Sequence, residues 1–162
     1  TPLSVEDALT LLKGVTNRAS LIAHLTINNQ IKTPFSVDDV LQLIDGVRNR
    51  GWSITDLANK GLIPNNVTSD QMSLLLGTQN DKWAIGAIKT LTSKGLVKND
   101  LNITQTLTIL SNLSDSSHTT YDNYRNDAIR VLLGDNATAK SYIKTPLSVE
   151  DALTLLKGVT NR

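Results

Sequence analysis

The segment TPLSVEDALTLLKGVTNR occurs twice without a change, at residues 1–18 and again at 145–162. A third and diverged copy, TPFSVDDVLQLIDGVRNR, lies at 33–50. Self-similarity at a fixed spacing is the sequence signature of architectures that stack one supersecondary unit on another. The duplication therefore constrains the fold of this chain more strongly than any other feature.

The identity of the terminal copies extends to positions that packing does not constrain. The diverged copy replaces Lys13 by Asp45 and Ala8 by Val40, whereas the copy at 145–162 keeps every surface letter. Two origins fit this identity: a natural array of a large unit that is cut slightly past one full unit, which we favour, or a deliberate duplication. On either origin, we expect 1–144 to form one full unit and 145–162 to begin the next.

Within the full unit, apolar residues recur at intervals of three and four, which is the spacing of one helix face. No stretch alternates with period two for long enough to predict a sheet. The sequence therefore predicts an all-α fold of tandem helix pairs, stacked as a short α-solenoid or a helical bundle. The four expected subrepeats span about 1–32, 33–66, 67–100 and 101–144.

Serine and glycine residues predict where several of these helices begin and end. Ser4, Ser36 and Ser53 each precede an apolar helical pattern and are predicted N-caps. Gly61 and Gly95 each stand between a lysine and a leucine, a pattern typical of a helix stop. In the fourth subrepeat, the expected helices span about 103–113, 121–133 and 137–143.

Composition excludes several classes of function. The formal net charge is +1, whereas nucleic-acid and membrane-surface binders normally carry a basic excess. The chain has no cysteine, which rules out disulfides, zinc–thiolate sites and cysteine nucleophiles. No apolar run approaches the length of a membrane span.

No motif of catalysis, phosphate binding or metal binding is present in the sequence. His118 lies near acidic residues in a polar turn and His24 lies beside a leucine, which is more typical of solvated polar groups than of catalysis. The carboxylate pairs stand at expected helix starts, where capping and the helix dipole explain them. We therefore predict a protein that is not an enzyme, with no cofactor and no metal.

The turns between paired helices are the most informative polar positions, because equivalent turns line up along one edge of a stack. Asparagine recurs at the matching place in three turns, where a turn-stabilising role is favoured over contact with a ligand. Trp52 and Trp83 also share one position and are predicted to pack between adjacent subrepeats; the alternative is an exposed stacking role. The predicted interaction edge consists of Arg18, Arg48, Asn49, Arg50, Asn80 and Lys82.

The second subrepeat carries a pattern that extends from Phe35 to Leu62, with F-S-x-x-D-V, a short turn, I-x-x-L and G-L in order. This pattern resembles the repeats of TAL-effector-like proteins, which are helix pairs of similar length that wrap DNA through their inter-helix turns. The resemblance implies nucleic-acid binding along the turn edge. The turns depart from the glycine pair of that family, since only Gly51 lies nearby.

The duplicated segment also predicts complementary ends. The copy at 145–162 is expected to leave open the surface that 19–32 would cover, and 1–18 to lack an upstream neighbour. Such a head-to-tail contact closes a ring or continues as a filament. The alternative is a monomer in which the last helix caps the fourth subrepeat.

The sequence as a whole favours a non-enzymatic structural or protein-interaction module of a larger repetitive bacterial protein. Its expected partners are another protein or neighbouring repeat units, with a homo-oligomer or head-to-tail assembly as one form. Nucleic-acid binding through Arg18, Arg48, Arg50 and Lys82 is the second hypothesis. The localisation stays open; a secreted or cell-surface bacterial protein is compatible with the sequence.

Overall fold

The computed structural model describes residues 2–15, 18–31, 33–47, 49–78, 82–113, 124–134, 141–157 and 159. Across these residues the chain forms nine α-helices and no strand, which confirms the predicted all-α class. The helices are α1 (Val5–Leu11), α2 (Ala19–Ile27), α3 (Val37–Leu43), α4 (Arg50–Asn59), α5 (Ser69–Leu76), α6 (Lys82–Ser93), α7 (Ile103–Leu110), α8 (Tyr124–Leu132) and α9 (Val149–Leu156).

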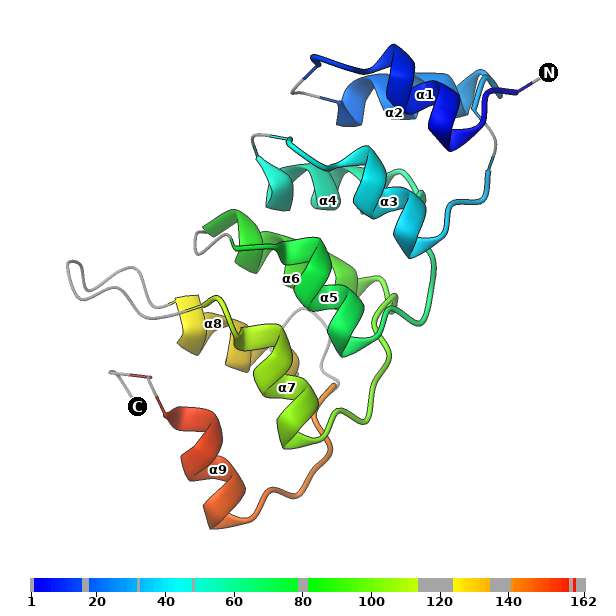
Figure 1. Ribbon diagram of the computed structural model, residues 1–162. Coiled ribbons are helices and arrows are strands. Elements are labelled where there is room, and N and C mark those ends of the chain that lie inside the picture. Colours follow the sequence, from blue (N-terminus) through cyan, green and yellow to red (C-terminus); the bar gives the residue numbers. More distant parts are fainter. Residues whose placement is uncertain are drawn as a thin grey trace.

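The helices lie in two layers (Figure 1). In one layer α1, α3, α5, α7 and α9 each pack against the next member. In the other layer α2, α4, α6 and α8 do the same, and a contact between α4 and α5 joins the layers. The two chain ends lie at opposite ends of the molecule (Figure 1).

Side-chain caps fix the starts of the odd-numbered helices. Ser4 accepts a hydrogen bond from the backbone N–H of Asp7 (3.1 Å), as its position in the sequence predicts. Ser36 accepts from the N–H of Asp39 (3.1 Å), and the Asp39 carboxylate accepts from the N–H of Ser36 (3.0 Å). The same reciprocal box starts α5 and α7. Each cap contributes about 1 kcal/mol to helix stability.

Glycine ends α4 and α6, as predicted. The N–H of Leu62 donates to the carbonyl of Leu57 (3.0 Å), and the N–H of Gly61 donates to that of Ala58 (3.0 Å). The same pair of bonds closes α6 at Gly95. Both glycines have positive φ, +73° at Gly61 and +69° at Gly95, which other residues adopt only with strain.

Isolated parallel bridges tie the segment before an odd helix to the segment after the following even helix. In the described residues they join Leu3 to Ile31, Val67 to Val97 and Leu101 to Ile143. The bridge at Ile143 corrects the helix predicted for 137–143, because 141–143 are not helical and 137–140 lie outside the described residues. The N–H of Leu101 donates to the carbonyl of Tyr142 (2.9 Å), and the N–H of Lys144 donates to the carbonyl of Leu101 (2.8 Å), which holds this segment extended.

Ser53 is not the N-cap that its sequence pattern predicts. The N–H of Ser53 already donates to the carbonyl of Asn49 (2.9 Å), so α4 begins earlier and Ser53 lies inside it. Ser53 is 1% exposed, and its hydroxyl has no hydrogen-bond partner among the described residues. The capping pattern at Ser53 therefore does not set the start of α4.

Aliphatic side chains from both layers form a cluster that extends from α1 to beyond α9. Ile54, Leu57 and Ala58 of α4 are all buried. The largest side chains with less than 2% exposure are Leu12, Ile22, Leu43, Ile44, Ile54, Leu57, Met72, Leu75, Ile88, Leu91, Leu110 and Leu132.

At Gly51, the backbone of α4 approaches the backbone of α6 so closely that there is no room for a side chain. A Cβ atom on Gly51 would stand 2.5 Å from the carbonyl carbon and oxygen of Trp83, and 2.9 Å from the nitrogen of Ala84. These are backbone atoms of α6, so they cannot move aside as the end of a side chain could. Gly51 therefore sets how closely α4 approaches α6.

We expect Gly51→Ala to destabilise the protein by roughly 1–3 kcal/mol in urea denaturation, the usual cost of overpacking. The matched control is Gly86→Ala in α6, where an added Cβ meets no atom within 4 Å. That control should stabilise by about 0.5–1 kcal/mol, because alanine is the better helix former. If both variants stabilise the protein, the close contact of α4 with α6 is wrong.

Candidate interaction edge

Three of the predicted edge residues lie at the starts of successive even-numbered helices. Arg18 immediately precedes α2, and Arg50 and Lys82 are the first residues of α4 and α6. They follow one another at intervals of 32 residues. Arg48 and Asn80 lie outside the described residues.

The Arg50 side chain binds the end of a neighbouring helix. Its Nε donates to the carbonyl of Leu75 (2.6 Å) and its Nη2 donates to the carbonyl of Leu74 (2.8 Å). Both carbonyls lie in the last turn of α5, where backbone acceptors lack partners in the helix and a positive charge is favourable. Burial lowers the pKa of Arg50, and the negative charge of Asp45 opposes that shift.

Arg18 repeats this arrangement one pair earlier. Its Nη1 donates to the carbonyl of Leu43 (3.1 Å), the last residue of α3, and its Nε donates to the carbonyl of Val15 (2.8 Å). Like Arg50, it therefore binds the end of an odd helix in the next pair. The donors of both arginines thus lie on the protein backbone, and a ligand role for these two residues of the predicted edge stays a prediction.

Arg125, on α8, also binds the end of an odd helix, but that helix belongs to its own pair, and sequence reasoning missed this residue. Its Nη1 donates to the carbonyls of Leu110 (3.1 Å) and Leu113 (3.2 Å), at the end of α7. Arg18 and Arg50 could be found from the sequence because they lie one repeat interval apart. Arg125 stands outside that interval, so only the folded structure reveals it.

Lys82 and Asn49 are exposed members of the predicted edge. The Nζ of Lys82 lies 5.1 Å from the centroid of the Trp83 ring, a cation–π contact. Asn49 precedes α4 with φ of −111°, so it does not adopt the left-handed conformation that asparagine tolerates in turns. In the described part of the chain its side chain makes no capping bond.

The two tryptophans occupy corresponding positions on α4 and α6 but stay partly open to solvent. Trp52 is 37% exposed and Trp83 is 41% exposed. The close approach between α4 and α6 is made at Gly51 by the backbone of Trp83. Packing of the two indole rings between adjacent subrepeats stays a prediction, and so does the alternative of an exposed stacking role.

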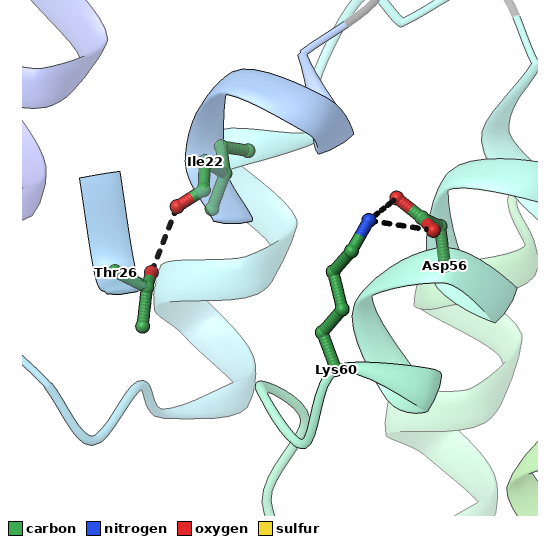
Figure 2. A network of polar contacts seen from close by, with 4 residues as sticks. All are labelled: Ile22, Thr26, Asp56 and Lys60. Carbon is green, nitrogen blue, oxygen red and sulfur yellow. Dashed lines mark hydrogen bonds and ion pairs between the residues drawn. The ribbon is translucent and has the colours of Figure 1, made fainter. Parts of the chain in front are cut away.

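A groove of about 430 Å³ lies beside α2 and α4, and two of its polar side chains, Thr26 and Lys60, bond to nearby residues. Thr26 donates to the carbonyl of Ile22 (2.8 Å), and the Lys60 Nζ donates to both carboxylate oxygens of Asp56 (2.7 and 2.8 Å; Figure 2). The other residues around the groove are Thr33, Pro34, Phe35, Gly61, Leu62, Ile63 and Pro64. The lining contains no set of converging titratable groups of the kind that catalysis requires.

Of the two histidines, the structure describes His24 alone. His24 is exposed, and its Nε2 lies 3.2 Å from the Asn28 side-chain nitrogen, while His118 falls outside the described residues. Within the described residues, no group of three or more His, Asp or Glu side chains could hold a metal ion. In the same part of the chain, no helix has both the length and the apolar character needed to cross a membrane.

No family model, curated protein or solved structure matches this chain.

We expect Arg50→Met, which keeps the alkyl chain and removes the donors, to cost roughly 1.5–3 kcal/mol in urea denaturation. The reason is the loss of charge-assisted bonds to two carbonyls at the end of α5. Lys82→Met is the matched control at the first residue of α6 and should cost below about 1 kcal/mol, because Lys82 is exposed. Equal effects of the two substitutions would contradict the role assigned to Arg50.

Proposed function

We propose that this chain is a non-enzymatic helical-repeat module, an α-solenoid segment of a larger repetitive protein. It presents a surface built from successive helix pairs to a protein partner or to neighbouring units. The observation that carries the proposal is the succession of contacts from α1 to α9 in one layer and from α2 to α8 in the other. Layers of this kind grow by adding pairs, and each pair contacts only its neighbours.

Recurring bonds between pairs support the same proposal. Arg18 reaches Leu43 and Arg50 reaches Leu75 across the same number of residues, so one inter-pair bond is made twice. Glycine closes α4 and α6 with the same pair of backbone bonds. Repetition of bonds at a fixed interval is what a stack of related units predicts.

The identical terminal segments give the stack a means of continuing. Because 145–162 repeats 1–18, the α9 segment can begin a second unit as α1 begins the first. The proposed biological role is therefore structural: a long protein assembled from such units would display the same surface many times. A protein partner that contacts several units would gain affinity from their number.

Nucleic-acid binding along the turn edge is the second candidate. It is favoured by Lys82, which is exposed beside an aromatic ring. It is disfavoured by Arg18 and Arg50, whose donors bind backbone carbonyls, and by the net charge of +1. Phosphate neutralisation supplies most non-specific affinity, and among the edge cations that the structure describes Lys82 alone is exposed.

We expect a chain in which 1–144 is joined directly to 1–162 to behave as one elongated particle. Small-angle X-ray scattering should give a maximum dimension close to twice that of the single-unit chain, because the second unit continues both layers. A scattering profile of two compact bodies joined by a flexible link would contradict the solenoid. In parallel, the protein should pass through a heparin column at low salt; salt-dependent retention would favour nucleic-acid binding.

A further inference from the structure

The identical helices α1 and α9 are buried on different faces. Leu11 in α1 is 63% exposed, whereas Leu155, the same residue of the repeat in α9, is 2% exposed. Since α9 packs against α7, that helix has an upstream neighbour. Leu11 lies on the corresponding face of α1. Among the described residues, no helix packs on that face of α1 as α7 packs on α9.

The opposite face shows the reverse pattern. Val149 and Leu153 in α9 are 78% and 56% exposed. Their counterparts in α1, Val5 and Leu9, are partly buried and pack against the hydrophobic cluster. Each face of the repeated helix is therefore covered in one copy and open in the other.

The surface that covers α1 is identifiable. The N–H of Leu3 donates to the carbonyl of Gln30 (2.8 Å), and Leu3 forms a parallel bridge with Ile31. Downstream, α1 packs against α3, and Ile22 of α2 belongs to the same buried cluster. Because α9 has the same amino-acid sequence as α1, this surface fits α9 as well.

We propose that a second copy of this chain docks on the open face of α9, so that α9 takes the place of the second copy's own α1 on its α2 and α3. This proposal rests on the proposed function, since it treats α9 as the first helix of a next unit. Both contacts of the docked helix already exist once in the chain, as α9 on α7 and as α1 on α3. Stacking α9 on an intact α1 would instead require a contact between two copies of one helix that the structure does not contain.

Exchange of an identical element conserves the contacts that it breaks. The association is therefore expected to be weak and dependent on concentration, and to require release of α1 from its own chain. This requirement gives an unusual signature. One substitution made at the same position of the two identical helices should have opposite effects on assembly.

The test is light scattering of the full chain over a concentration series, with the pair Leu9→Asp and Leu153→Asp. Wild-type mass should rise with concentration. Leu153→Asp should abolish the rise, because it places a charge on the docking face. Leu9→Asp should lower the midpoint concentration about tenfold, because it weakens α1 on its own chain and frees the surface that α9 needs.

Leu11→Asp separates exchange from direct stacking. Leu11 is exposed and belongs to the helix that exchange displaces, so this variant should associate like the wild type. Loss of association in Leu11→Asp would overturn the exchange, as would a wild-type chain that stays monomeric throughout the series. Leu11→Asp also provides a test if Leu9→Asp fails to fold, which circular dichroism would reveal.

The scattering experiment on the joined two-unit chain does not depend on association between molecules, so the solenoid can hold even if this proposal fails.

Discussion

Packing between successive helices of one layer is the interaction on which the rest of this structure depends. The helices have only 7 to 12 residues, and isolated helices of that length are marginal in water. Their apolar faces become buried only when another pair is added, as Ile54 and Leu57 of α4 are beside α6. The absence of a Cβ atom at Gly51 lets these two backbones come close, which explains why glycine stands at that point.

Polar bonds then fix the order of the pairs. An unpartnered carbonyl at a helix end needs a donor, and arginine supplies several donors in a rigid fork. Arg18 and Arg50 each bind the end of an odd helix in the next pair, and Asn112 donates to the carbonyl of Gly77 (2.7 Å) between α7 and α5. Arg125 binds the end of α7 within its own pair. Of the predicted interaction edge, Arg18 and Arg50 thus join successive pairs, and a ligand role for the edge as a whole stays a prediction.

Local patterns predicted the helix faces and ends because their causes are local. A spacing of three and four identifies the buried face of α4, and a glycine with positive φ ends it at Gly61. The misreadings have tertiary causes. Ser53 begins an apparent capping pattern inside a helix, and Arg50 finds its acceptors in a different helix pair. Ile143 is extended by a single bridge to Leu101, which is too short to leave a period of two in the sequence.

Hydrogen exchange of backbone amides, measured residue by residue on dilute protein, tests the stacking most directly. In a stack where each pair is stabilised only by its neighbours, protection should be greatest in α4 and α6 and fall toward α1 and α9. The middle helices have a neighbour on both sides, whereas α1 and α9 each have one open face. Protection of α1 and α9 equal to that of α6 would contradict the account, because it would mean that the chain opens as one cooperative body.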